Sequence, residues 1–92
     1  MKIVISRSYG GFALSLTAQK RYSELTGIYC DYYSKFKRDD PMLIQTVEEL
    51  GEAANDAHGA KLKVVEIPDD VEWIIEEYDG REWIAEKHRT WY

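Results

Sequence analysis

The strongest constraint in the sequence is a turn signal near its C-terminal end. Tyr78-Asp79-Gly80 separates two segments, 71–77 and 81–87, that are rich in β-branched and aromatic residues. An Asp-Gly pair between such segments is typical of a β-hairpin, because both residues tolerate the positive φ that tight hairpin turns require. The sequence therefore predicts a C-terminal β-hairpin.

Two registers of this hairpin are open. A two-residue turn would pair Glu77 with Glu82, whereas a three-residue connection with Gly80 as a bulge would pair Glu77 with Arg81. Like charges directly opposite each other are unfavourable, and apolar cross-strand pairs are favourable. We predict the bulged register, with Ile74 and Ile84 on one face and a larger apolar set on the other: Val71, Trp73, Ile75, Trp83 and Ala85.

Two helices have clear boundaries in the sequence. Ser15 is a good N-cap for a helix over 16–26, which Gly27 would end. Asp40 and Pro41 open a second helix, as N-cap and first helical residue. Its apolar residues recur at helical spacing, and its glutamates fall off that stripe: Leu43, Val47, Leu50 and Ala54 against Glu48, Glu49 and Glu52.

The remaining segments are extended by pattern. The run 2–6 is β-branched and apolar, as in a strand buried on both faces, and 61–67 is a further extended segment. The aromatic segment 28–38 is either an edge strand or a long loop. With 92 residues the chain fits one domain over 1–92. We predict an α+β fold with a four- or five-stranded mixed sheet, two helices on one face and the C-terminal β-hairpin.

The formal net charge of −5 is unevenly distributed. Residues 1–38 carry seven basic and two acidic groups, whereas residues 39–80 carry two basic and thirteen acidic groups. An acidic chain is poorly suited to duplex nucleic acid, whose phosphates supply most of the binding energy. The basic third is either an ordinary solvated surface or a face that holds a small anion.

The sequence is poor in catalytic and metal-binding patterns. Cys30 is the single cysteine, the histidines are His58 and His88, and no zinc-binding spacing joins them. We therefore expect no metal, no cofactor and no catalytic residue, and we predict a protein that is not an enzyme. No apolar run of membrane-spanning length and no signal-peptide pattern occurs, so a soluble domain of a reducing compartment is expected.

The loop 7–14 is the first candidate binding site. Arg7 precedes Tyr9, Gly10, Gly11 and Phe12, and a helix is expected to follow. Backbone amides of a glycine-rich loop before a helix can hold phosphate, an arginine can clamp it, and an aromatic ring can stack on a base. A double glycine can equally form only a tight turn.

Two other segments are candidates for the same site. The tail holds His88, Arg89 and Trp91, and the tryptophan would either pack on the core or stack on a ligand. The segment 29–38 mixes aromatic rings with bases and ends at Arg38, a composition of nucleotide-binding surfaces and also of subunit interfaces. We predict a homo-oligomer from this segment and from the second face of the hairpin.

Three stretches of the sequence resemble a family of small hypothetical proteins of tailed bacteriophages and prophages: MKIVISRSYGGFALS, FKRDDPMLIQTVEELGEAAN and EIPDDVEWIIEEYDGREWIAEKHRTW. The resemblance covers nearly the whole chain. It implies an accessory protein in the cytoplasm of an infected bacterial cell. Small phage proteins of this kind often counter host defence, either by sequestering nucleotide signals or by blocking a defence protein.

Three functions follow, in order of preference. The first is a non-enzymatic binder that sequesters a small, anionic, nucleotide-derived signal. The second is a protein inhibitor whose acidic segment 39–80 meets a basic host protein. The third is a nucleotide-cleaving enzyme with His88 as general acid or base.

Overall fold

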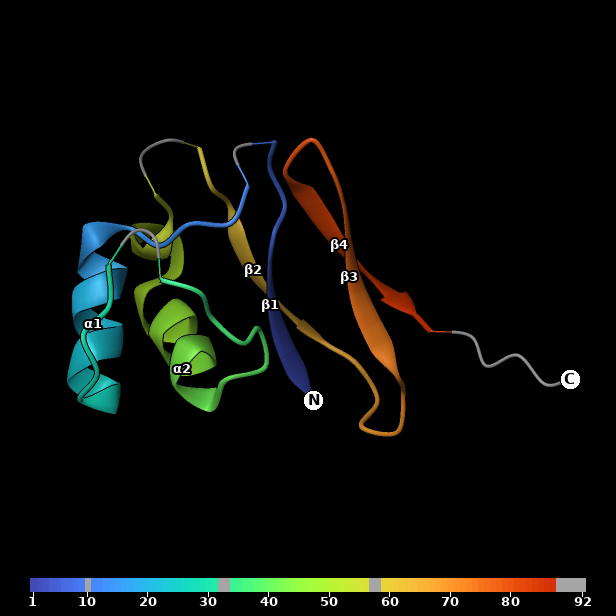
Figure 1. The fold of residues 1–92 in the computed structure, drawn as a ribbon, viewed down its shortest axis with the longest axis horizontal. Coiled ribbons are helices and arrows are strands. Elements are labelled where there is room, and N and C mark those ends of the chain that lie inside the picture. Colours follow the sequence, from blue (N-terminus) through green and yellow to red (C-terminus); the bar gives the residue numbers. More distant parts are fainter. Residues whose placement is uncertain (10, 32–33, 57–58, 88–92) are drawn as a thin grey trace, which may run out of the picture.

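The computed structural model describes residues 1–9, 11–31, 34–56 and 59–87. In chain order its elements are β1 (Lys2–Ser6), α1 (Leu16–Thr26), α2 (Pro41–Leu50), the short 3₁₀ helix η1 (Gly51–Ala54), β2 (Leu62–Glu66), β3 (Trp73–Tyr78) and β4 (Arg81–Glu86). The two helices lie on one side of β1 and β2, and β3 and β4 lie on the other side (Figure 1). The fold is thus a small α+β structure, as predicted.

Both helices begin at the predicted residues and α1 ends as predicted, whereas the helical stripe expected to reach Ala54 is divided between α2, which ends at Leu50, and η1. The Ser15 side chain accepts a hydrogen bond from the Ala18 amide, and Gly27 closes α1 in the left-handed conformation. The Asp40 side chain accepts from the Met42 amide, and Pro41 occupies the first position of α2. These caps are local, because the Ser15 and Asp40 side chains accept from amides of the first turn and the Gly27 amide donates to the Ser23 carbonyl of the last turn.

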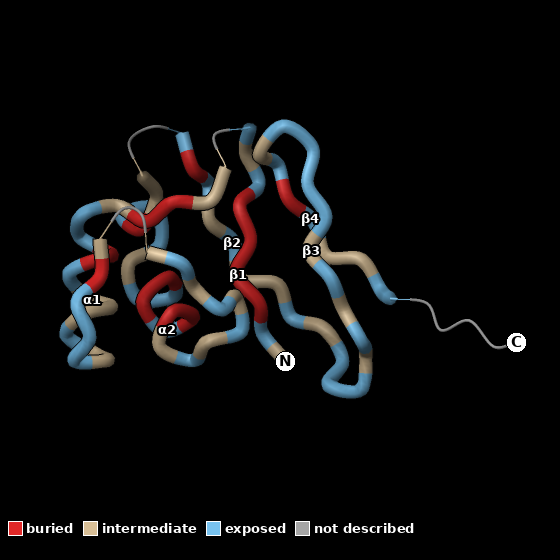
Figure 2. The backbone as a smooth tube through the Cα atoms, viewed as in Figure 1, coloured by how far each residue is buried: buried red, intermediate tan, exposed pale blue. Residues whose placement is uncertain are grey.

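The core lies between the helices and the β1–β2 sheet. Its buried members come from β1, α1, α2, η1 and the residue Leu14, and Figure 2 shows buried residues in β1 and α2. Partly buried side chains complete the cluster on its rim. The buried set comprises Val4, Leu14, Ala18, Leu43, Ile44, Val47 and Ala54.

The single sheet expected from the sequence is wrong. β1 pairs antiparallel with β2, and β3 pairs antiparallel with β4, in two separate two-stranded sheets among the described residues. The other edge of β1 is occupied differently: the Val4 amide donates to the Arg38 carbonyl (2.9 Å), and the Ser6 amide donates to the Glu82 carboxylate (2.8 Å). Because these donors are already satisfied, β4 lies beside β1 without a ladder.

The preferred register of β3 and β4 is also wrong. Tyr78 pairs with Arg81 and Glu77 with Glu82, across a two-residue turn in which Asp79 and Gly80 both have positive φ. The repulsion expected between the two glutamates is removed, since Glu82 is buried in an ion pair with Arg38 while Glu77 is exposed.

The register also separates two isoleucines that were expected on one face. Ile74 pairs with Ala85, and Ile84 pairs with Ile75, so the two residues point to opposite sides of the β3–β4 sheet. Ile74 is exposed and Ile84 is half-buried. The apolar face proposed for subunit contact therefore has a different composition, and the homo-oligomer stays a prediction.

The described part of segment 28–38 forms no strand, so the long-loop alternative holds. Phe36 packs edge-on against Tyr22, with ring centroids 5.1 Å apart, and lies 6.1 Å from the Phe12 ring. Phe36 thereby packs against the core cluster, and Arg38 lies at the edge of β1.

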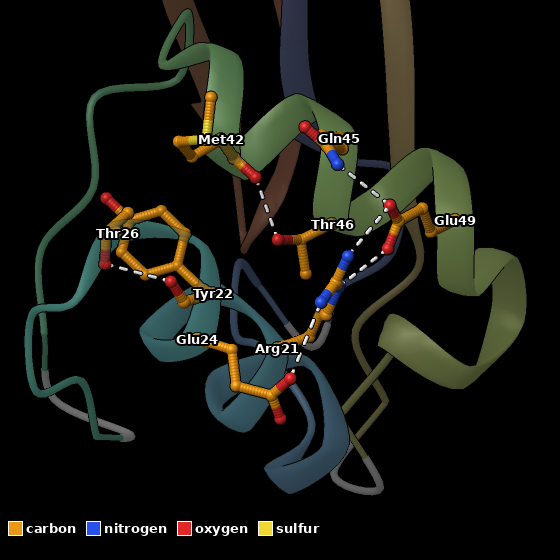
Figure 3. Close-up of polar contacts among 8 residues, drawn as sticks. All are labelled: Arg21, Tyr22, Glu24, Thr26, Met42, Gln45, Thr46 and Glu49. Atoms are coloured by element: carbon orange, nitrogen blue, oxygen red, sulfur yellow. Dashed lines mark hydrogen bonds and ion pairs between the residues drawn. The ribbon is translucent and has the colours of Figure 1, made fainter.

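Polar contacts tie α1 to α2 on the surface (Figure 3). Arg21 donates to both oxygens of Glu49, at 2.8 and 3.2 Å, and also contacts Glu24. Gln45 donates to Glu49 from the preceding turn of α2. Both arginine and glutamate of the interhelical pair remain more than a third exposed, so the pair is expected to contribute little to stability.

Raising the pH through the alkaline range is expected to destabilise the fold through Tyr22. Burial, together with the hydrogen bond that its hydroxyl donates to Asp40 (2.6 Å), raises the pKa of Tyr22 to about 12. The unfolded tyrosine ionises near pH 10, so this contribution is complete below about pH 10 and is lost as the pH rises towards 12.

Urea unfolding at a series of pH values from about 9 to about 12 measures this effect. Tyr22→Phe removes the titrating hydroxyl, and its free energy of unfolding should fall less steeply over this range than that of the wild type. Parallel pH profiles for the two proteins would contradict the assignment.

Candidate functional site

A concavity of about 320 Å³ lies at one end of the sheets, between the loop that follows β1 and the turn that joins β3 to β4. Both walls carry an arginine and an aromatic ring, and the β4 wall also carries a carboxylate. The lining residues are Arg7, Tyr9, Tyr78, Arg81, Glu82 and Trp83.

The first wall is set by hydrogen bonds at the end of β1. The Arg7 amide donates to the Lys61 carbonyl (2.7 Å), which extends the β1–β2 pairing by one residue. The Ser6 hydroxyl donates to the Gly11 carbonyl (2.7 Å), and the Ser8 hydroxyl donates to the Gly59 carbonyl. These contacts hold the loop across the end of the sheet and leave the Arg7 and Tyr9 side chains exposed.

The second wall is set by the turn between β3 and β4. Because Tyr78 pairs with Arg81, the two side chains lie on the same face, and Trp83 follows on that face two residues later. The Trp83 indole donates to the Glu76 carboxylate (3.1 Å). Tyr78 is 72% exposed and Trp83 38% exposed, so both rings can be reached by a ligand.

The two walls meet at Gly80. A Cβ atom placed on this residue would lie 2.5 Å from the Tyr9 carbonyl oxygen and 2.8 Å from the Gly11 nitrogen. Only a residue without a side chain can approach the loop backbone this closely. The close contact explains why residues separated by about seventy positions line one concavity.

Glu82, the carboxylate in the lining, is held in an ion pair. Its two carboxylate oxygens accept from the two terminal nitrogens of Arg38 at 2.6 and 2.9 Å, and one of them also accepts from the Ser6 amide. The guanidinium of Arg38 lies 3.7 Å from the centroid of the Phe12 ring. The charge of Glu82 is therefore compensated by a cation outside the pocket lining.

Arg7 and Arg81 are differently placed. Both side chains are exposed, and neither has an ion-pair partner among the residues that the structure describes. Two guanidinium groups without an ion-pair partner, one on each wall, would attract an anion bound between them. Such groups bind phosphate or carboxylate through paired N–H donors.

The structure places the predicted site residues in three groups. Arg7 and Tyr9 line the pocket, whereas Phe12 and Arg38 lie behind its wall, against Phe36 and Glu82. The Gly11 amide donates to the Ser8 carbonyl (3.2 Å), so it serves the turn of the loop. The remaining four predicted residues lie outside the described ranges: Gly10, His88, Arg89 and Trp91.

Four lining residues were not predicted: Tyr78, Arg81, Glu82 and Trp83. The sequence could have indicated them through a two-residue turn at Asp79-Gly80, because that turn places Tyr78 beside Arg81. In the bulged register that pairing does not occur.

The described residues form neither a membrane-spanning helix nor a metal-binding cluster. No helix there is both long and apolar enough to cross a membrane. No group of three or more histidine, cysteine or acidic side chains gathers there in a way that could hold a metal ion. Comparison with known proteins gives no match to a family model, to a curated protein or to a solved structure.

Proposed function

We propose that this protein binds a small, anionic, nucleotide-derived ligand in the pocket between the 7–11 loop and the β3–β4 turn. The observation that carries the proposal is the lining itself, in which two uncompensated arginines stand among three exposed aromatic rings. Guanidinium groups suit phosphate, and an aromatic ring that stacks on a base contributes about 1–3 kcal/mol. A volume of about 320 Å³ suits a small ligand.

The ligand is held and not converted. The one carboxylate in the lining, Glu82, has both oxygens engaged by Arg38 and Ser6. Because both oxygens already accept hydrogen bonds from the protein, neither is free to exchange a proton with a reacting group. Sequestration of a nucleotide signal therefore fits the pocket better than cleavage. Together with the resemblance to phage proteins, it makes counter-defence the proposed biological role.

Removing either free arginine is expected to weaken binding by about 10- to 100-fold, the effect of losing a hydrogen bond to a charged group. Calorimetry with linear and cyclic ADP-ribose and with cyclic dinucleotides measures this, first on the wild type and then on Arg7→Gln and Arg81→Gln. Lys20→Gln is the matched control, because Lys20 is an exposed cation on α1 outside the pocket lining. The control should bind as the wild type does.

The proposal would be refuted if calorimetry detects no binding of ADP-ribose, cyclic ADP-ribose or any cyclic dinucleotide. A salt-sensitive complex with a purified basic host protein would then favour inhibition through the acidic segment 39–80. Where binding is found, the ligand is recovered after protein denaturation: intact ligand supports sequestration, and a cleaved product indicates an enzyme.

A further inference from the structure

The Arg38–Glu82 ion pair connects β4 to the edge of β1, two strands that share no ladder of hydrogen bonds among the described residues. Glu82 lies between Arg81 and Trp83 in the second pocket wall, and its carboxylate accepts from the amide of Ser6, the last residue of β1. Arg7, in the first wall, follows directly. The Glu82 carboxylate therefore links the two walls: Glu82 follows Arg81 in the sequence, and its partner Ser6 precedes Arg7.

Arg38 is itself anchored on the core side of this contact. Its carbonyl accepts from the Val4 amide (2.9 Å), one terminal nitrogen lies 3.4 Å from the Val4 carbonyl oxygen, and the guanidinium stacks over Phe12. The side chain of Glu82 is 8% exposed and that of Arg38 is 21% exposed. A planar fork held on three sides can fix the carboxylate in both distance and direction.

We infer that Arg38 and Glu82 are positioning residues that hold the two pocket walls in register. Arg38 also neutralises the Glu82 carboxylate of the lining, so that Arg7 and Arg81 are left to attract an anion. Arg38 therefore promotes anion binding without touching the anion. The effect on ligand affinity rests on the proposed function, whereas the effect on the position of the β3–β4 sheet does not.

Glu82→Gln tests this inference, with Glu49→Gln as a matched control. Glu49 forms the other bidentate arginine pair, with Arg21 between the two helices and outside the pocket lining (Figure 3). Hydrogen exchange followed by NMR should be at least about tenfold faster at the Ser6 amide in Glu82→Gln, because its acceptor is weakened. Nuclear Overhauser contacts between Gly80 and Tyr9 should also be lost. The amides of α1 and α2, and all these signals in Glu49→Gln, should remain as in the wild type.

Arg38→Lys separates position from charge, since lysine keeps the cation but cannot form the fork. ADP-ribose binding by calorimetry should weaken by about tenfold or more in Glu82→Gln and in Arg38→Lys, and stay within about twofold in Glu49→Gln. If Glu82→Gln does not fold, both the hydrogen-exchange measurement and the ADP-ribose titration are made on Arg38→Lys.

Unchanged exchange at Ser6 and retained Gly80–Tyr9 contacts in the pocket variants would overturn the inference. So would equal losses in Glu49→Gln. If the wild type does not bind ADP-ribose or the other nucleotides, the proposed function fails, and the exchange measurement alone decides whether the pair positions the walls.

Discussion

Replacing Arg38 by methionine is expected to lower the free energy of unfolding by about 3 kcal/mol. Methionine keeps much of the apolar stem but removes the cation, so the Glu82 carboxylate would stay buried without its partner. Breaking a buried pair from one side typically costs about 3–5 kcal/mol. The lower end applies here because the Arg38 side chain keeps about a fifth of its exposure. In a domain whose total stability is about 5–14 kcal/mol, this is a large fraction.

Urea unfolding of four proteins isolates this effect. Arg38→Met combined with Glu82→Gln should recover much of the loss, because no charge is left unpaired and the amide oxygen can still accept from Ser6. Arg21→Met removes the exposed interhelical pair and should cost no more than about 1 kcal/mol. Equal losses for Arg38→Met and Arg21→Met, or no recovery in the double variant, would contradict the assigned role of the buried pair.

Replacing Gly80 by alanine is expected to cost about 2–4 kcal/mol and to separate the two pocket walls. A left-handed conformation costs a residue with a Cβ atom about 1–2 kcal/mol, and Gly80 has a φ of 90°. In addition, the new Cβ would lie 2.5 Å from the Tyr9 carbonyl oxygen, so the turn or the loop must move. A backbone displacement of this kind adds to the conformational cost.

Gly27→Ala is the control for the conformational part. Gly27 has a φ of 72°, and a Cβ atom built on it meets nothing within 4 Å. Its loss of stability in urea unfolding should therefore reflect the left-handed conformation and no contact. Gly80→Ala should lose at least about 1 kcal/mol more, and its ADP-ribose affinity should fall. Equal losses of stability in the two variants would mean that the close contact of Gly80 with the Tyr9 and Gly11 backbone does not add to the cost.

The beginnings of both helices and the end of α1 could be predicted because they depend on neighbours in the sequence. Ser15, Gly27, Asp40 and Pro41 each act within one helical turn, and all four have the expected role. Three members of the expected apolar stripe are also buried, Leu43 and Val47 in α2 and Ala54 in η1. Such features need no knowledge of the remote parts of the chain.

The pairing of the strands could not be predicted in the same way. The edge of β1 that was expected to join one large sheet is occupied by the Arg38 carbonyl and the Glu82 carboxylate. The register of β3 and β4 depends on the same contact, since Arg38, 44 residues away, removes the cost of placing Glu82 opposite Glu77. A rule that considers only directly opposite charges does not include Arg38, because Arg38 is remote from Glu82 in the sequence.

Of the candidate site, only the first wall could be predicted from local sequence. Arg7 and Tyr9 were found because a basic residue, an aromatic residue and two glycines follow a strand. The second wall, with Tyr78 and Arg81, depends on the turn register and on the approach of Gly80 to the loop. Arg38 was expected to contact the ligand, and the structure instead places it on Glu82.

The most direct test of the account is an NMR titration of the isotope-labelled protein with ADP-ribose. The Trp83 indole N–H and the side-chain N–H groups of Arg7 and Arg81 should shift with the same dissociation constant, because all three residues line one pocket. The amides of α2, which is outside that lining, should not move. Saturating shifts confined to α2 or to another surface, or an unchanged spectrum with ADP-ribose and with the cyclic nucleotides, would contradict the proposed pocket.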